Sequence, residues 1–254
     1  MRKVVFFLMA AVVVAAAFFV WLYPQYEVPI LMYHSFNEAL VGKYAAVSPK
    51  VFARQMEFLH DRGYHVISLE EYCWMRISDK RIPRNSVVLT IDDGYEDTVR
   101  AFEILDRYDF PVTAFVITEK IGTAGYLTRE DIQRYLSNRT GTLGSHTMTE
   151  AYLPEISEPA LEKEVITSKK VLEKRFEVPV NTFSYTRGGY DRRVLAKVEE
   201  AGYLCACTTN RGYTKDQPRY ELRRIKVTDR DTGIRFWGKL TGYYNVFREL
   251  KEPH

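Results

Sequence analysis

The chain has little excess of charge of either sign, which argues against one large class of partners. Its 36 lysine and arginine residues nearly balance 33 aspartate and glutamate residues, for a formal net charge of +3, and the basic residues are spread along the sequence. Proteins that bind nucleic acid usually gather basic residues on one face to follow the phosphate backbone. We therefore expect no nucleic-acid partner.

Cysteine is also scarce, with 3 residues in the chain of 254. This number is too small for a disulfide scaffold. Cys205 and Cys207 lie two positions apart in an apparent strand, where their side chains point the same way without being easily bridged. We expect all three cysteines to be buried thiols.

Glycine-rich phosphate loops, internal repeats and low-complexity linkers are absent from the sequence. No GxGxxG or GxxxxGK[ST] pattern follows any expected strand, so nucleotide binding has no support. The composition is 46% hydrophobic and 14% aromatic, which suffices for one substantial core. We expect one domain preceded by an N-terminal appendage.

The N-terminal part of the sequence contains a long apolar run. Arg2 and Lys3 precede an uncharged stretch over residues 4–22, which is long enough to span a bilayer. A secretory signal peptide has a shorter apolar region followed by a small-residue cleavage site. Ala15 and Ala17 offer such a site, so both an anchor and a signal peptide are open.

An uncleaved anchor over residues 1–23 is the favoured interpretation, because cleavage after the alanines would leave the apolar residues 18–22 exposed. The positive-inside rule keeps Arg2 and Lys3 in the cytoplasm. Residues 24–254 would then form a domain attached to the cytoplasmic membrane by a single span and facing the periplasm or the cell exterior. Cleavage would instead release this domain as a secreted protein.

Beyond the apolar run, short apolar segments alternate with amphipathic ones. We expect strands over 29–33, 65–68, 86–91, 112–117, 140–145, 180–184, 203–208 and 222–227. We expect helices from Ser48-Pro49 onward and over 70–76, 95–108, 128–137, 159–176, 192–201 and 232–240. Strands that alternate with helices indicate an α/β fold with a mainly parallel sheet, and about seven such units fit a barrel better than an open sheet.

Polar residues follow several of these strands, where the chemistry of a barrel is located. They are His34, Asp92 with Asp93, Ser145 with His146, and Tyr185 with Arg187. Two adjacent aspartates repel each other unless a cation, a proton or hydrogen bonds compensate. The alternative is a helix cap, because Asp-Asp-Gly also begins a turn.

His146 and Glu150 strengthen the case for a metal site. They are four residues apart in His-Thr-Met-Thr-Glu, and the chain has only 5 histidines from which to build another site. Together with Asp93 they form a possible ligand set with open positions. Such a set suits Zn²⁺, Co²⁺, Mn²⁺ or Fe²⁺.

At these residues the sequence resembles the polysaccharide deacetylases, also called the NodB homology domain or carbohydrate esterase family 4. The run Thr90-Ile91-Asp92-Asp93-Gly94-Tyr95 resembles their TFDDG motif, and residues 145–150 fall where their histidine motif lies. Residues 28–35 resemble the opening strand of one branch, and residues 183–190 resemble its FAYPYGGY segment. The resemblance implies a deformed (β/α) barrel with about seven parallel strands, here behind an N-terminal transmembrane or signal helix.

The resemblance also implies a division of labour in the site. Asp93 and His146 would bind a divalent metal, with zinc preferred over cobalt or manganese, and Asp92 would act as general base. A backbone N–H near Arg187 would help to stabilise the oxyanion. The implied reaction removes acetyl groups, N-acetyl in the first place and O-acetyl in the second, from an acetylated amino-sugar polysaccharide, oligosaccharide or sugar precursor of the envelope or cell exterior.

Three positions depart from the family pattern. Glu150 stands where a second histidine is usual, and it either ligates the metal through oxygen or points away and caps the following turn. Arg187 follows Thr186 where Pro-Tyr is expected, and it either binds an anionic sugar or forms an ion pair. His34 is the substitute for the usual catalytic acid, or else a packed histidine.

These departures leave two alternatives to a working deacetylase. One is a catalytically impaired protein of the same fold that binds glycans. The other is a hydrolase of a different non-peptide carbon–nitrogen bond, because the fold alone does not dictate the substrate. The oligomeric state is not indicated by the sequence.

Overall fold

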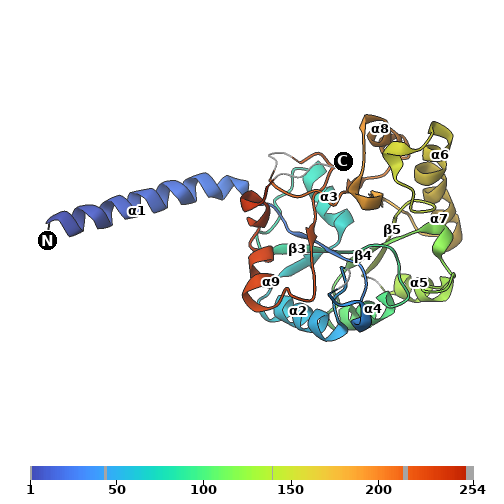
Figure 1. The fold of residues 1–254 in the computed structure, drawn as a ribbon, viewed down its shortest axis with the longest axis horizontal. Coiled ribbons are helices and arrows are strands. Elements are labelled where there is room, and N and C mark those ends of the chain that lie inside the picture. The colour runs from blue at the N-terminus through green and yellow to red at the C-terminus, as the bar shows by residue number, and fades with distance from the viewer. Residues whose placement is uncertain (1, 43–44, 139, 214–216, 250–254) are drawn as a thin grey trace.

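The computed structural model describes residues 2–42, 45–138, 140–213 and 217–249, so the last residues of the expected domain, 250–254, lie outside the described part. The first helix, α1 (Arg2–Leu22), projects as a single rod from the packed part of the molecule (Figure 1). Val5–Gln25 has a mean hydropathy of 2.8 with none of its most apolar stretch buried, and within the described chain it is the one segment long and apolar enough to cross a membrane. This finding rests on length and composition.

The packed part is built on one curled parallel sheet. Its path runs β7-β6-β5-β4-β3-β1-β8, and β2 pairs with β3 beside that path. The strands are β1 (Ile30–Tyr33), β2 (His65–Ile67), β3 (Ser86–Ile91), β4 (Val112–Val116), β5 (Gly141–Ser145), β6 (Thr182–Ser184), β7 (Cys205–Cys207) and β8 (Ile225–Lys226). All of their pairings are parallel. The expected deformed (β/α) barrel is confirmed as a curled, barrel-like sheet.

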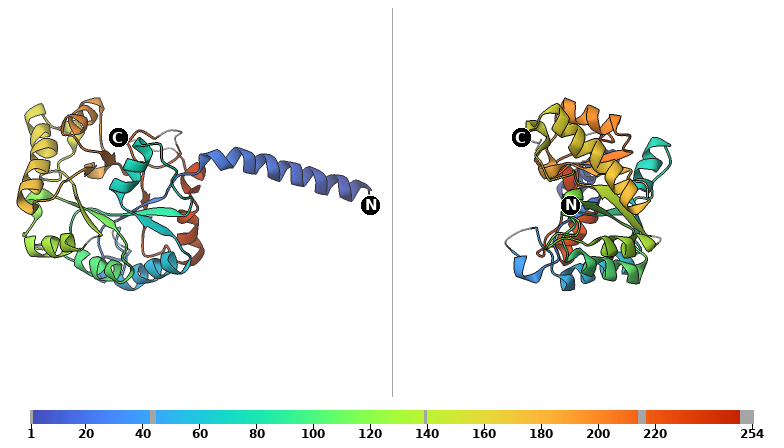
Figure 2. Two further views of the ribbon diagram at one scale, coloured as in Figure 1. Left: turned by 180° about the vertical axis from the view of Figure 1, so that it is seen from behind. Right: turned by 90° about the vertical axis from the view of Figure 1, so that its right-hand side faces the viewer.

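Helices surround this sheet (Figures 1 and 2). They are α2 (Pro49–Asp61), α3 (Leu69–Ile77), α4 (Thr98–Leu105), α5 (Arg129–Ser137), α6 (Glu158–Glu162), α7 (Ser168–Phe176), α8 (Arg192–Glu200) and α9 (Gly233–Leu240). Local sequence explains several of their first residues. Ser48 caps α2 ahead of a proline in the first turn, and Thr128 and Asp131 form a capping box at the start of α5.

Residues 222–226 join the two ends of the curled sheet. Leu222 bridges Cys207 of β7, and three residues later Ile225 pairs with Leu31 of β1. The segment therefore makes backbone contacts to both edges. Arg224 lies between these two contact points, which places its side chain inside the curl.

Apolar side chains form two separate clusters because strand residues alternate between the faces of the sheet. The larger cluster lies between the sheet and the helices and includes Leu89 and Ile91. The smaller cluster fills the interior of the curl and includes Ile30, Val88 and Phe115. Residue 88 lies on the interior side of β3, so Asp92 four residues on is aimed into the same interior.

The cysteines correct one expectation. Cys73 in the middle of α3 and Cys205 on β7 form a disulfide, with Cα atoms 6.6 Å apart, and only Cys207 is a free, buried cysteine. Sequence spacing considered the neighbouring pair Cys205 and Cys207, whereas the fold brings together residues 132 positions apart. The link closes the end of the barrel at which the strands begin.

Candidate functional site

The two aspartates that follow β3 point in different directions because the backbone reverses between them. Asp92 continues the sheet, and its N–H donates to the Tyr33 carbonyl at 3.0 Å. Asp93 and Gly94 both have positive φ, 73° and 71°. A Cβ at Gly94 would lie 3.0 Å from Val116 Cγ1, so this turn favours glycine on two counts. The helix-cap alternative is wrong, because Asp97 is the residue that precedes α4.

Asp92 is held by Arg224 in a fully buried, two-bond ion pair. Nη1 and Nη2 of Arg224 lie 2.6 Å from Oδ1 and Oδ2 of Asp92, respectively. The same guanidinium also donates to Thr90 Oγ1 at 3.2 Å, to Ser184 Oγ at 2.8 Å and to the Thr208 carbonyl at 3.2 Å. Every N–H direction of this arginine is thus used, which is the condition under which a buried ion pair is tolerated.

This pairing decides the protonation state of Asp92. Burial by itself raises the pKa of the carboxyl, but the positive charge and hydrogen bonds of Arg224 outweigh burial and hold the pKa at about 2. Asp92 is therefore ionised throughout the neutral pH range. The carboxylate is positioned and charged before any substrate arrives.

Asp93 and His146 form the second pair of the site. His146 Nε2 lies 3.3 Å from Asp93 Oδ1, and both side chains are almost entirely buried. The other ring nitrogen, Nδ1, lies 2.8 Å from the Ser184 carbonyl. Because a carbonyl only accepts, Nδ1 carries the proton and Nε2 directs its lone pair toward Asp93 when the ring is neutral.

The space between Asp93 and His146 favours a positive charge. Burial lowers the pKa of His146, but the hydrogen bond to Asp93 and the negative charges of Asp92 and Asp93 outweigh burial, and the net effect is a raised pKa. Two ligands about 2.1 Å from one tetrahedral zinc ion lie about 3.4 Å apart, close to the observed separation. The donor chemistry and the spacing of this pair fit two ligands of a divalent metal.

Glu150 is not grouped with this pair. Its residue is exposed and its backbone N–H donates to Thr147 Oγ1 at 3.0 Å. No set of three or more His, Cys, Asp or Glu side chains within the described ranges is close enough to hold a metal ion. Thr147 and Glu150 have φ of 69° and 72°, so the chain turns sharply twice after His146.

Glu164 fixes this double turn from a distance. Its buried carboxylate accepts hydrogen bonds at 2.9 Å from the backbone N–H groups of Met148 and Thr149, and at 2.6 Å from Thr149 Oγ1. Glu164 comes from the π-helical turn (Lys163–Thr167) between α6 and α7. A π-turn often marks a functional position, and here it directs a carboxylate at the loop that carries His146.

His34 lies where the sequence places it, directly after β1. Burial lowers its pKa, while the nearby negative charges of Asp92 and Asp93 oppose this effect. Its Nδ1 is buried and has no hydrogen-bond partner within the described part of the chain. A histidine packed only for structure would be expected to donate to a backbone carbonyl, and within the described chain no such bond is found for this nitrogen.

Arg187 lies in a short 3-10 turn (Thr186–Gly188) after β6, with φ of 54°. Thr209 Oγ1 donates to its carbonyl at 3.1 Å, and a Cβ at Gly188 would lie 2.1 Å from that same threonine oxygen. The turn adjoins the histidine loop, since Thr147 Oγ1 and Thr186 Oγ1 are 3.5 Å apart. The Arg187 side chain is exposed, and no ion pair to it is found among the described residues.

Sequence reasoning missed three residues that shape this site. Arg224 and Glu164 position the two motifs, and Asp97 fixes the loop after β1 by accepting from Ser35 Oγ at 2.6 Å and from the Phe36 N–H at 2.9 Å. The expected strand over 222–227 contains Arg223, Arg224 and Lys226, and nothing in this pattern singles out Arg224. Nothing local marks Glu164 or Asp97.

The curled parallel sheet, with a carboxylate pair and a histidine at the ends of its strands, matches a known class of hydrolase. Residues 79–206 match the family model for polysaccharide deacetylase. The YxkH protein of Bacillus subtilis (strain 168), assigned to the polysaccharide deacetylases, is 32% identical over 212 residues, which are 83% of this chain and 75% of that protein.

Two further proteins that resemble this chain are also deacetylases. The poly-beta-1,6-N-acetyl-D-glucosamine N-deacetylase of Staphylococcus aureus (strain MSSA476) is 23% identical over 76% of this chain and 72% of its own length. The structure of the Streptococcus pyogenes deacetylase PplD, in complex with acetate, superposes with a TM-score of 0.78 at 26% identity, over 84% of this chain and 97% of that chain. The chain therefore belongs to the polysaccharide deacetylase family, and it is a hydrolase that acts on carbon–nitrogen bonds.

Proposed function

We propose that this protein is a metal-dependent deacetylase that removes N-acetyl groups from an acetylated amino-sugar polysaccharide outside the cytoplasmic membrane. The observation that carries the proposal is that the two adjacent carboxylates at the end of β3 have different partners. Asp92 is held ionised by Arg224, and Asp93 faces His146 at 3.3 Å. One carboxylate is suited to accept a proton and the other to hold a cation.

Asp93 and His146 would hold the metal, and Glu150 is the proposed third ligand. Its carboxylate would have to turn toward Asp93 and His146, since the exposed side chain is not part of a three-ligand group in the described structure. A divalent metal at this position, zinc before cobalt or manganese, supplies Lewis acidity that acidifies water and polarises an acetyl carbonyl.

The protein's own residues supply the remaining parts of the reaction. The Asp92 carboxylate accepts the proton that the attacking water loses. The backbone N–H at Arg187 donates to the acetyl oxygen as negative charge develops there. His34 donates a proton to the departing amino-sugar nitrogen, and acetate and the free amine leave. The lowered pKa of His34 makes its protonated form a stronger acid.

The proposed location rests on two independent features. The exposed apolar helix α1 is long enough to cross a bilayer, and the disulfide Cys73–Cys205 is of a kind that forms in oxidising compartments outside the cytosol. Both favour residues 24–254 facing the periplasm or the cell exterior. Protease treatment of spheroplasts, in which the outer side of the cytoplasmic membrane is accessible, would test this with an epitope at the C-terminus: protection of the epitope would contradict the proposal.

Metal content and acetate release by the full chain in detergent test the catalytic proposal. The substrate is an N-acetylglucosamine oligomer, with Zn²⁺, Co²⁺ or Mn²⁺ supplied in turn. We expect one bound metal per chain and acetate release that Asp92→Asn abolishes with the metal retained. The control is the same change at an exposed aspartate with positive φ, Asp79→Asn. A folded chain that binds the oligomer but holds no metal and releases no acetate would overturn the proposal in favour of glycan binding.

Glu150→Ala tests the third ligand separately. Loss of bound metal with an unchanged melting temperature supports ligation by Glu150. Full metal occupancy in the variant contradicts it and leaves Glu150 as a residue of the turn alone.

A further inference from the structure

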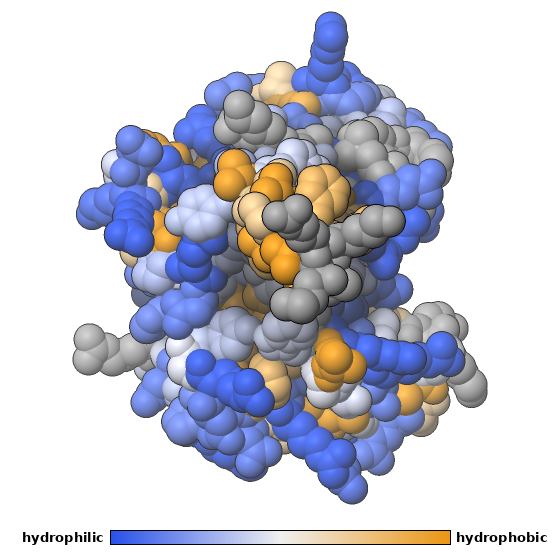
Figure 3. Space-filling model, turned by 90° about the vertical axis from the view of Figure 1, so that its left-hand side faces the viewer, coloured by the Kyte–Doolittle hydropathy of each residue, from blue (hydrophilic) through white to orange (hydrophobic). Residues whose placement is uncertain are grey.

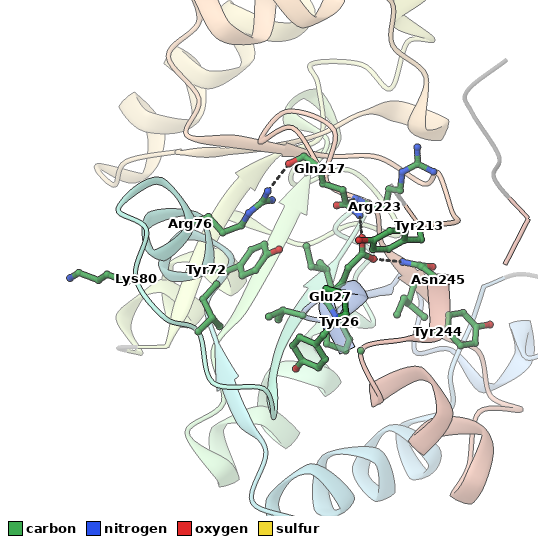
Figure 4. Close-up of a pocket in the computed structure, with 17 residues that line it drawn as sticks. Tyr26, Glu27, Tyr72, Arg76, Lys80, Tyr213, Gln217, Arg223, Tyr244 and Asn245 are labelled. Atoms are coloured by element: carbon green, nitrogen blue, oxygen red, sulfur yellow. Dashed lines mark hydrogen bonds between the residues drawn. The ribbon is translucent and has the colours of Figure 1, made fainter. Parts of the chain in front are cut away.

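A cavity of about 380 Å³ opens at the end of the barrel opposite to the catalytic residues. We call it the foot cavity and define it by Tyr26, Glu27, Arg76, Lys80, Arg223 and Asn245 (Figure 4). Ile30, the first residue of β1, also lines it, whereas His34 follows the last residue of that strand. The proposed deacetylase reaction makes no use of this cavity.

Positive charge prevails in the foot cavity. Among the described residues that line it, Arg76, Lys80 and Arg223 are basic and Glu27 is acidic. Arg84 adds a further cation at the edge, where its guanidinium carbon lies 5.0 Å from the centre of the Tyr26 ring. Figure 4 shows the Arg76 side chain directed toward Gln217 across the cavity, whereas the Lys80 and Arg223 side chains point outward from its rim. Guanidinium groups are typical of sites that bind phosphate.

Glu27 repels a bound anion less strongly than an ordinary carboxylate would, because it is not fully ionised. Gln217 Nε2 donates to its Oε1 at 3.0 Å and Asn245 Nδ2 lies 3.4 Å from its Oε2. Burial nevertheless dominates and raises the pKa of Glu27 to about 7. Near neutral pH the group is therefore partly protonated, and in that form it can donate as well as accept a hydrogen bond.

Two buried polar atoms of the cavity lack any hydrogen-bond partner within the described part of the chain. They are the Tyr26 hydroxyl and Oδ1 of Asn245, a residue that is 6% exposed. An unpaired buried polar group costs about 1–3 kcal/mol, so such atoms mark places where a ligand or water completes the structure. One of them can donate to a phosphate oxygen, and the other can only accept, for example from an alcohol.

The foot cavity lies at the base of α1. Tyr26 and Glu27 follow the apolar helix by a few residues, and Arg84 Nη2 donates to the Tyr23 carbonyl at 3.0 Å, which ties the end of the helix to the domain. Trp21 and Tyr23 are exposed at this end, as is common at a membrane–water interface. Figure 3 looks along α1 toward the packed domain, so the apolar side chains at its centre are those of the projecting helix, with hydrophilic side chains of the domain around them.

We propose that the foot cavity binds the phosphate of an anionic phospholipid whose headgroup carries hydroxyl groups, such as phosphatidylglycerol, from the membrane that α1 crosses. Arg76 contacts the phosphate, Lys80 and Arg223 at the rim attract it, and Asn245 Oδ1 accepts from a headgroup hydroxyl. The inference rests on the proposed membrane anchorage and not on the deacetylase reaction. Its consequence is directional: a lipid held at the amino ends of the strands leaves the carboxyl-end site facing away from the bilayer, toward a polymer.

The test measures lipid retention by the full chain in detergent, using native mass spectrometry. The chain is offered equal amounts of dioleoylphosphatidylglycerol and dioleoylphosphatidylcholine. We expect one phosphatidylglycerol to be retained in preference to phosphatidylcholine. Arg76→Gln combined with Lys80→Gln should lower this retention at least five-fold. The matched control, Lys50→Gln combined with Arg81→Gln, removes the same charge from exposed residues that do not line the cavity.

Separate arms distinguish a lipid from a free phosphate. Inorganic phosphate and sn-glycerol 3-phosphate are offered alone, and binding of these with no preference between the two lipids would overturn the lipid assignment. Equal retention in both double variants would overturn the site. Tyr26→Phe removes only the unpaired hydroxyl, so weaker retention with an unchanged melting temperature supports the contact without any risk to folding. Lipid retention is read independently of acetate release, so failure of one proposal leaves the other standing.

Discussion

A buried carboxyl group has a lowered pKa at one end of the barrel and a raised pKa at the other. At the carboxyl ends of the strands, Asp92 receives two hydrogen bonds from a guanidinium, and its pKa is about 2. At the amino ends, Glu27 receives hydrogen bonds from two neutral amides, and its pKa is about 7. Both groups are desolvated by the same fold. The difference shows that a cation at bonding distance, and not burial, decides which carboxyl group is a permanent charge.

The largest expected effect comes from removing that cation. Arg224→Met leaves Asp92 buried with no opposite charge, so we expect a loss of about 3–5 kcal/mol in the free energy of unfolding and a rise in the pKa of Asp92. Urea unfolding of the full chain in detergent measures the loss. Arg219, exposed and 3.4 Å from Glu199, provides the control: Arg219→Met should cost less than about 1 kcal/mol. Equal losses would contradict the argument.

The disulfide at the amino ends should contribute next. Cys73→Ser removes a link between residues 132 positions apart, and loss of a native disulfide typically costs about 2–5 kcal/mol. Thiol titration of the unfolded, unreduced protein should find one reactive thiol, that of Cys207. Three thiols would contradict the disulfide. Cys207→Ala, which leaves the link intact, is the matched control.

Glu27 should make stability depend on pH in the sense opposite to Asp92. The pKa of Glu27 in the folded protein, about 7, exceeds the ordinary value of 4.5. The contribution of Glu27 to the free energy of unfolding is therefore complete below about pH 4.5 and is lost as the pH rises through 7. Glu27→Gln should remove this loss and be more stable than the natural chain at pH 8, by about 1–2 kcal/mol. Urea unfolding at several pH values measures how the free energy of unfolding changes with pH in the natural chain and in the variant.

The corresponding group at the other end provides the contrast. Asp92 has a folded pKa below its ordinary value of 3.8, so its contribution is present above about pH 4 and is lost as the pH falls toward 2. Asp92→Asn should therefore change the acid side of the stability profile and leave its neutral and alkaline side unaltered in slope. A change confined to the alkaline side would contradict the assignment.

The smallest effect is expected for the unpaired hydroxyl of the foot cavity. Tyr26→Phe removes a group that has no partner among the described residues, so the free energy of unfolding should change by less than about 0.5 kcal/mol. Tyr185→Phe is the comparison, because its hydroxyl donates to the Tyr220 carbonyl at 2.9 Å and its loss should cost about 1 kcal/mol. Similar costs for both would argue that Tyr26 has a partner.

Local pattern was sufficient for the elements and for the motif that carries the chemistry. The apolar run before Asp92 predicts β3 with the bounds that the structure shows, Ser86–Ile91, and Thr128 with Asp131 predicts the capping box of α5. Such features depend on neighbours a few residues away, through strand alternation and capping hydrogen bonds. The convergence of Asp93 and His146 also follows, because the carboxyl ends of parallel strands meet at one end of a barrel.

The tertiary structure alone decided which partners hold these residues. Arg224 reaches Asp92 across 132 positions, Glu164 holds the turn after His146 from a neighbouring helix, and Cys73 finds Cys205 rather than Cys207 as a partner. The foot cavity likewise combines the end of α1 with α3 and the C-terminal loops. A sequence specifies residue types and periodicity along the chain, whereas the charge state of a buried group depends on which distant side chain the closed sheet brings within bonding distance.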